Sequence, residues 1–160
     1  MRHRRTSHLA RVILLTLPLL LAVAAPARAQ DPITSSMLGP FQGGYNYPGG
    51  GSCSADVVTF VGTAHVMCQV PTSPTGTVTC YINLLADRGI GAATGRLYHA
   101  VGEAQATCPP GVLCMLSSNT YKVIPDPACP QTTMTVYALV TFDENGHIVE
   151  AVFSPQPINP

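Results

Sequence analysis

Hydrophobic and polar residues alternate with a period of two along most of residues 53–154, and no stretch has helical spacing. Such alternation is typical of strands that bury one face and expose the other. Short strands separated by turn residues are typical of an antiparallel sandwich or barrel. We therefore predict an all-β fold, a small antiparallel β-sandwich or a partly open barrel, over residues 53–154.

One hairpin is predicted between residues 65–70 and residues 78–84. Setting Cys68 opposite Cys80 makes one face of this hairpin wholly apolar. A slip by one residue would mix the two faces and lose buried apolar area, so the pattern specifies the register. This register favours a Cys68–Cys80 disulfide. The alternative is that both cysteines point into the core and bridge to other elements.

A second hairpin is predicted between residues 133–142 and residues 147–153. The loop at residues 143–146 ends in Asn-Gly, which supplies the positive φ that tight hairpin turns need. Treating these four residues as the loop pairs Val140 with Val149, and one face of the hairpin is again apolar.

The outward face of the second hairpin is also apolar, although one face of such a strand is normally in contact with water. Its apolar side chains are Tyr137, Leu139, Ile148 and Val152. Either the segment 108–129 covers them, or some of them stay exposed as an interaction patch centred on Tyr137 and Leu139. Further strands are expected at residues 55–62, 96–106 and 121–124.

The two ends of the predicted domain contain many Gly and Pro residues. Residues 30–52 are expected to form a flexible leader, and residues 155–160 a frayed tail. Phe41, Tyr45 and Tyr47 lie within the leader. They either form a recognition segment or rest on the domain.

Residues 1–29 have the pattern of a secretory signal peptide: a basic start, an apolar run at residues 12–25 and small residues at Ala27 and Ala29. The apolar run is shorter than the roughly 20 residues that cross a bilayer. We therefore expect cleavage after Ala29, a secreted or periplasmic product and no membrane span after cleavage.

All six cysteines lie after the predicted cleavage site, and an even number in an exported chain predicts three disulfides. No C-x-x-C pair is present to indicate a zinc site. The cysteines are Cys53, Cys68, Cys80, Cys108, Cys114 and Cys129.

Cleavage would leave three basic residues against eight acidic ones, a net charge of −5. So few cations cannot neutralise a row of phosphates, which argues against binding to nucleic acid or to an anionic membrane surface. The basic residues that remain are Arg88, Arg96 and Lys122.

Signatures of catalysis are weak in this sequence. No Gly-x-Ser-x-Gly motif is present, and nothing in the sequence selects one Ser-His-acid set from many. Residues 89–95 resemble a nucleotide loop, but Thr94 stands where a dinucleotide fingerprint needs Gly. A small secreted hydrolase is therefore the second interpretation.

Copper binding is the third interpretation, because His65, Met67 and His99 offer soft ligands in an exported chain. These residues form no His-x-His or His-x-x-x-His pair, so we predict no metal and no cofactor. The favoured interpretation is a secreted, non-catalytic binding or structural module, whose partner is a protein, a small molecule or a glycan.

Overall fold

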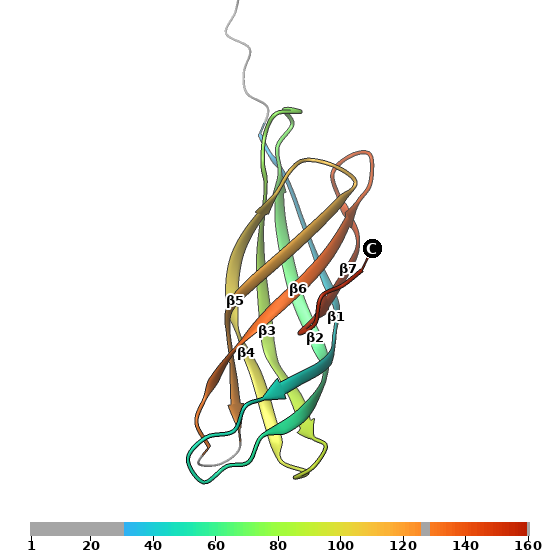
Figure 1. Cartoon of the computed structure of the whole chain (residues 1–160). Helices are drawn as coiled ribbons and strands as arrows, with labels where there is room; N and C mark the ends of the chain where they lie inside the picture. The colour runs from blue at the N-terminus through green and yellow to red at the C-terminus, as the bar shows by residue number, and fades with distance from the viewer. Residues whose placement is uncertain (1–30, 126–128, 160) are drawn as a thin grey trace, which may run out of the picture.

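The computed structural model describes residues 31–125 and 129–159, and strands make up most of this part of the chain. Each strand pairs with the next, and the last pairs with the first, so the sheet closes into a barrel (Figure 1). The prediction of an all-β fold is confirmed, but the sheet is a closed barrel and not a sandwich. The strands are β1 (Ile33–Tyr47), β2 (Asp56–Val70), β3 (Val78–Gly91), β4 (Leu97–Cys108), β5 (Leu113–Pro125), β6 (Thr132–Phe142) and β7 (Ile148–Ser154).

The prediction of a flexible leader at residues 30–52 is wrong, because β1 lies within it and pairs with β2 along its whole length. Because this segment has many Gly and Pro residues, the alternation of inward and outward positions along β1 was not recognised in its sequence. Phe41 and Tyr47 point into the barrel and are almost fully buried, so these aromatic side chains belong to the core. Beyond β7, Pro155 lies against Gly43 of β1, which shows that the predicted frayed tail begins by packing on the barrel.

The predicted register of the β2–β3 hairpin is confirmed. Cys68 pairs with Cys80, and Val66 pairs with Ile82. Cys68 and Cys80 form a disulfide, as the register favoured. The other two bridges join Cys53 to Cys129 and Cys108 to Cys114.

The predicted register of the β6–β7 hairpin is wrong, because the ladder has an irregularity between Thr141 and Phe142. Val140 pairs with Ala151 and not with Val149. The irregularity also exchanges the inner and outer faces at the start of β7. Ile148 is therefore buried and Val149 is exposed, the opposite of the predicted arrangement. Ile148 therefore belongs to the core and not to the predicted outward patch.

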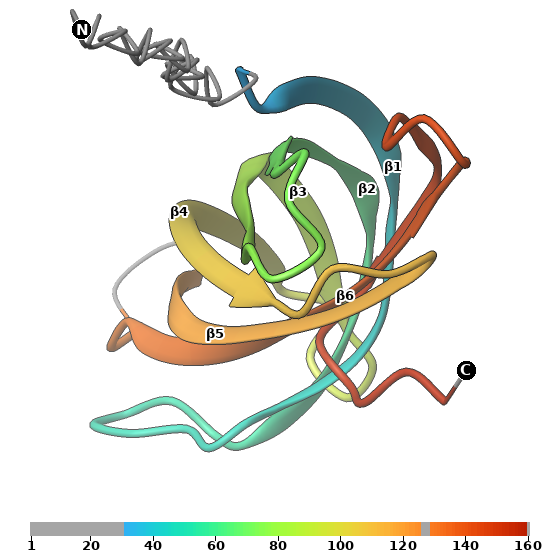
Figure 2. The ribbon, with the colours of Figure 1, turned by 90° about the horizontal axis from the view of Figure 1, so that it is seen from above.

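The barrel closes between β1 and β7, which run parallel and pair at Phe41 and Phe153. A Cβ atom on Gly39 would lie 2.1 Å from the carbonyl oxygen of Ala151, so only glycine permits this close approach. Seen from above, the strands surround one central space (Figure 2). Large apolar side chains fill it, among them Phe41, Phe60, Phe153, Tyr47, Tyr98 and Tyr121.

The predicted signal peptide, with its cleavage site after Ala29, lies outside the described residues. The three disulfides indicate an oxidising, extracytoplasmic environment. In the described part of the chain, no helix has the length and apolar character needed to cross a membrane.

Candidate functional site

Three hairpin loops meet at one end of the barrel (Figure 1). They surround a depression of about 750 Å³. The loops are residues 71–77, 109–112 and 143–147, and the start of β1 at Ile33 completes the border. We call this depression the barrel mouth. Because the interior is filled, ligands must bind outside the core, and barrel mouths are common binding positions.

The floor of the barrel mouth is apolar. Ile33, Val70 and Phe142 line it, and Phe142 is buried. Gly146 lies against Val70 and Ile33, so the β6–β7 turn packs on β1 and β2. The backbone N–H of Phe142 donates a 2.8 Å hydrogen bond to the carbonyl of Val112, which holds the β4–β5 loop beside the same floor.

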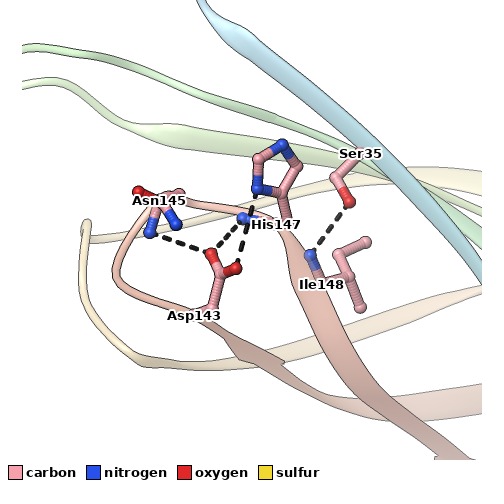
Figure 3. Close-up of polar contacts among 5 residues, drawn as sticks. All are labelled: Ser35, Asp143, Asn145, His147 and Ile148. Carbon is pink, nitrogen blue, oxygen red and sulfur yellow. Dashed lines mark hydrogen bonds and ion pairs between the residues drawn. The ribbon is translucent and has the colours of Figure 1, made fainter.

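Asp143 organises the rim of the barrel mouth (Figure 3). Its Oδ1 accepts hydrogen bonds from the backbone N–H of Asn145 at 2.9 Å and of His147 at 2.8 Å. These bonds, with that of His147 contributing most, hold the pKa of Asp143 below its usual range. The Asp143 side chain is therefore an anion at neutral and mildly acidic pH.

The rim also bears Glu144, and Lys and Arg are absent from the described lining residues. Arg96 follows the β3–β4 turn at the opposite end of the barrel, and Lys122 pairs with Val101 and Thr133 on the wall. The barrel mouth therefore combines an apolar floor with a negative rim.

Ser35, His147 and Asp143 come from distant parts of the sequence but lie close together here (Figure 3). Nδ1 of His147 is 3.7 Å from Oδ2 of Asp143. However, the hydroxyl of Ser35 accepts a 2.9 Å hydrogen bond from the backbone N–H of Ile148, which ties β1 to β7. This bond gives Ser35 a structural role in closing the barrel.

The residues of the copper hypothesis do not converge. His65 and Met67 line a groove on the outer surface of β2–β4, whereas His99 pairs with Arg88 and Ile124 and does not line that groove. The described part of the chain contains no cluster of three or more His, Cys, Asp or Glu residues that could hold a metal ion.

Three members of the predicted interaction patch lie on the outer surface, half-buried: Tyr137, Leu139 and Val152. Leu139 pairs with Val152 on one side and with Met115 on the other. Met115 is 57% exposed. The patch is therefore an apolar row across β5, β6 and β7, and it includes Met115, which the sequence pattern did not indicate.

Sequence reasoning also missed Asp87, a buried carboxylate at an irregularity shared by β2 and β3. Its Oδ1 accepts a 2.6 Å hydrogen bond from the backbone N–H of Thr63, and its Oδ2 has no partner among the described residues. Burial raises its pKa, and the hydrogen bond from Thr63 opposes that shift. The side chain occupies space left by Gly62, where a Cβ atom would lie 1.8 Å from Oδ1.

Comparison of the chain with protein-family models, with curated proteins and with solved structures gives no match. Interpretation of its function therefore depends on its own residues.

Proposed function

We propose that the protein is a secreted, non-catalytic binding module and that its barrel mouth takes an organic cation with an apolar part. The observation that carries this proposal is the combination of an apolar floor at Ile33, Val70 and Phe142 with an acidic rim. An apolar group would cover the floor, and a positive charge would approach Asp143 and Glu144.

The charge of the rim supports this choice of ligand. Asp143 keeps its charge because its pKa is lowered, and no Lys or Arg side chain among the described lining residues competes for it. His147, with Nδ1 3.7 Å from Oδ2 of Asp143, is the one lining side chain that can share its charge. An anionic ligand would be repelled by both carboxylates. A neutral apolar ligand would leave them without a counter-charge.

The experiment compares three probes of similar shape, benzylamine, benzyl alcohol and benzoate, by NMR titration of the protein that begins at Gln30. We expect benzylamine to bind most tightly and to shift the amide signals of residues 143–147. Its affinity should fall with added salt, since exposed charges are screened. Glu144→Gln should weaken it about two- to fivefold, whereas the control Glu150→Gln, outside the mouth, should not.

Equal affinity for the three probes would show that the acidic rim does not select a cationic ligand. Failure of all three to shift the mouth residues would overturn the proposal of a binding site there.

A second candidate function is capture of a protein partner, or self-association, through the apolar row of Met115, Leu139 and Val152. Met115 is exposed, and Leu139 and Val152 are half-buried beside it; adjacent apolar side chains that reach one surface are typical of protein contacts. Sedimentation of the wild type and of the double variant Tyr137→Ser with Leu139→Ser tests this function. Self-association of the wild type should be weaker in the variant, and a monomeric wild type would exclude self-association.

A further inference from the structure

A second depression, of about 510 Å³, lies on the outer surface of β2, β3 and β4, away from the loops that form the barrel mouth. We call it the wall groove. Eight residues line it, all of them on these three strands. Six of the eight have side chains on the outer face of the sheet: His65, Met67, Tyr81, Asn83, Glu103 and Gln105.

Strand register arranges these six side chains as two parallel rows. His65 pairs with Asn83, which pairs in turn with Glu103. The second row consists of Met67, Tyr81 and Gln105 in the same order. Neighbouring strands lie about 4.8 Å apart, and side chains two residues apart on one strand about 7 Å apart. The six side chains therefore cover an area of about 10 by 7 Å, comparable with a disaccharide.

The polar atoms of these side chains are available to a ligand. Within the described residues, the side chains of His65, Tyr81, Asn83, Glu103 and Gln105 form no hydrogen bond to the protein. All five are half-buried or exposed, and Tyr81 is 41% exposed. The strands fix the positions of these side chains, and their polar atoms are open to a ligand.

The chemistry of the groove selects among ligand classes. Two amides, an imidazole and a phenol can each donate and accept hydrogen bonds, and Glu103 accepts them. A polyhydroxylated ligand can use all of these groups, because each hydroxyl both donates and accepts. Glu103 is the only Asp, Glu, Lys or Arg among the lining residues, which disfavours anions. The exposed ring of Tyr81 offers an apolar face for the C–H groups of a sugar ring.

We infer that the wall groove is a binding site for a neutral saccharide. In this site Tyr81 supports one face of a sugar ring, and Asn83, Gln105 and Glu103 bind its hydroxyls. The site goes beyond the proposed function of the barrel mouth, because it lies on another surface and takes another class of ligand.

The experiment is an NMR titration of the protein that begins at Gln30 with glucose, galactose, mannose, N-acetylglucosamine and the disaccharides of each. We expect at least one of these probes to shift the amide signals of β2–β4 around His65, Tyr81 and Gln105. The dissociation constant should be in the millimolar range, as for a shallow and solvated site. Amide signals of residues 143–147 should not move.

Variants then test the residues. Tyr81→Ala should weaken binding about tenfold, and Gln105→Ala severalfold. The controls Val61→Ala and Gln42→Ala truncate exposed residues outside the groove and should bind as the wild type does. Wild-type signal dispersion will show that each variant is folded, and Gln105→Ala serves as the test if Tyr81→Ala does not fold.

The inference is overturned if no saccharide shifts the β2–β4 signals, or if folded Tyr81→Ala and Gln105→Ala both bind as the wild type does. Binding of benzylamine at residues 143–147 is read in the same spectra, so the barrel mouth and the wall groove can fail separately.

Discussion

Cys68 and Cys80 face each other across the β2–β3 ladder, with their Cα atoms 4.1 Å apart, and their disulfide lies inside the barrel. This bridge spans 12 residues of sequence within a single hairpin. The Cys53–Cys129 bridge spans 76 residues and joins the β1–β2 connection to the segment before β6. The two bridges therefore restrict the unfolded chain to different degrees.

Removing the long-range bridge should cost more stability than removing the local one. The chain-entropy relation gives about 4.5 kcal/mol for the Cys53→Ala, Cys129→Ala double variant and about 3 kcal/mol for Cys68→Ala, Cys80→Ala. Urea unfolding of both variants measures the difference. If the variant without the Cys68–Cys80 bridge loses more free energy of unfolding than the other, packing of these buried sulfurs outweighs loop entropy.

The phenol of Tyr121 should matter more than that of Tyr98, although both rings are buried. Tyr121 on β5 donates a 3.1 Å hydrogen bond to the carbonyl of Ile82 on β3, across the interior. The hydroxyl of Tyr98 is buried without a hydrogen-bond partner among the described residues. Tyr121→Phe should lower the free energy of unfolding by about 1–2 kcal/mol, and Tyr98→Phe should change it little. Similar losses from both would show that Tyr98 has a partner in solution.

Asp87 should make stability fall as pH rises. Its pKa is raised in the folded state, so the folded protein binds a proton more tightly than the unfolded chain does. The contribution of this group is therefore greatest at low pH and is lost as pH rises from its ordinary pKa through its folded pKa. Asp87→Asn keeps an oxygen for the N–H of Thr63 and carries no charge.

We therefore expect Asp87→Asn to be at least as stable as the wild type at pH 7. The free energy of unfolding of the wild type should rise relative to that of this variant as the pH falls toward 3.8, the ordinary pKa of Asp. Urea unfolding at both pH values gives the two differences. Parallel changes in the two proteins would show that Asp87 keeps its charge in the folded state over this range.

The two sides of the β6–β7 hairpin should respond differently to truncation. Ile148 is buried, so Ile148→Ala should cost about 2–4 kcal/mol. Tyr137 and Leu139 lie half-buried on the outer surface, and replacing both with Ser should change stability by no more than about 1 kcal/mol. Thermal unfolding compares the two variants. A large loss from the double Ser variant would show that these side chains act as core.

The sequence predicted those parts of the fold that depend on local pattern. The β2–β3 register follows from the alternation of faces around Cys68 and Cys80. The Asn-Gly turn predicted before β7 is present, with Gly146 at φ 80°. The irregularity beside Phe142 was not predictable. It shifts the pairing of β6 with β7 by one residue, and the alternation of apolar and polar residues does not show where such a shift occurs.

Closure of the barrel and the candidate sites could not be predicted for a different reason. Gly39 and Pro40 suggested a linker, but β1 forms because β2 and β7 lie on either side of it. The wall groove joins His65, Asn83 and Glu103 through two registers, and only one of these, between β2 and β3, followed from the pattern. Asp87 was missed because its burial depends on the absence of a side chain at Gly62.

Because β1 pairs with β7, β1 is synthesised more than 100 residues before one of its two partners. A nascent chain that stops before Ile148 has no partner for the outer edges of β1 and β6. Open strand edges adhere to other chains, so we expect unfinished molecules to need a chaperone. β7 is the shortest of the described strands. Its loss would open the closed barrel and leave unpaired backbone groups along the edges of β1 and β6. A stop codon just before Ile148 should therefore be as damaging as one within β4.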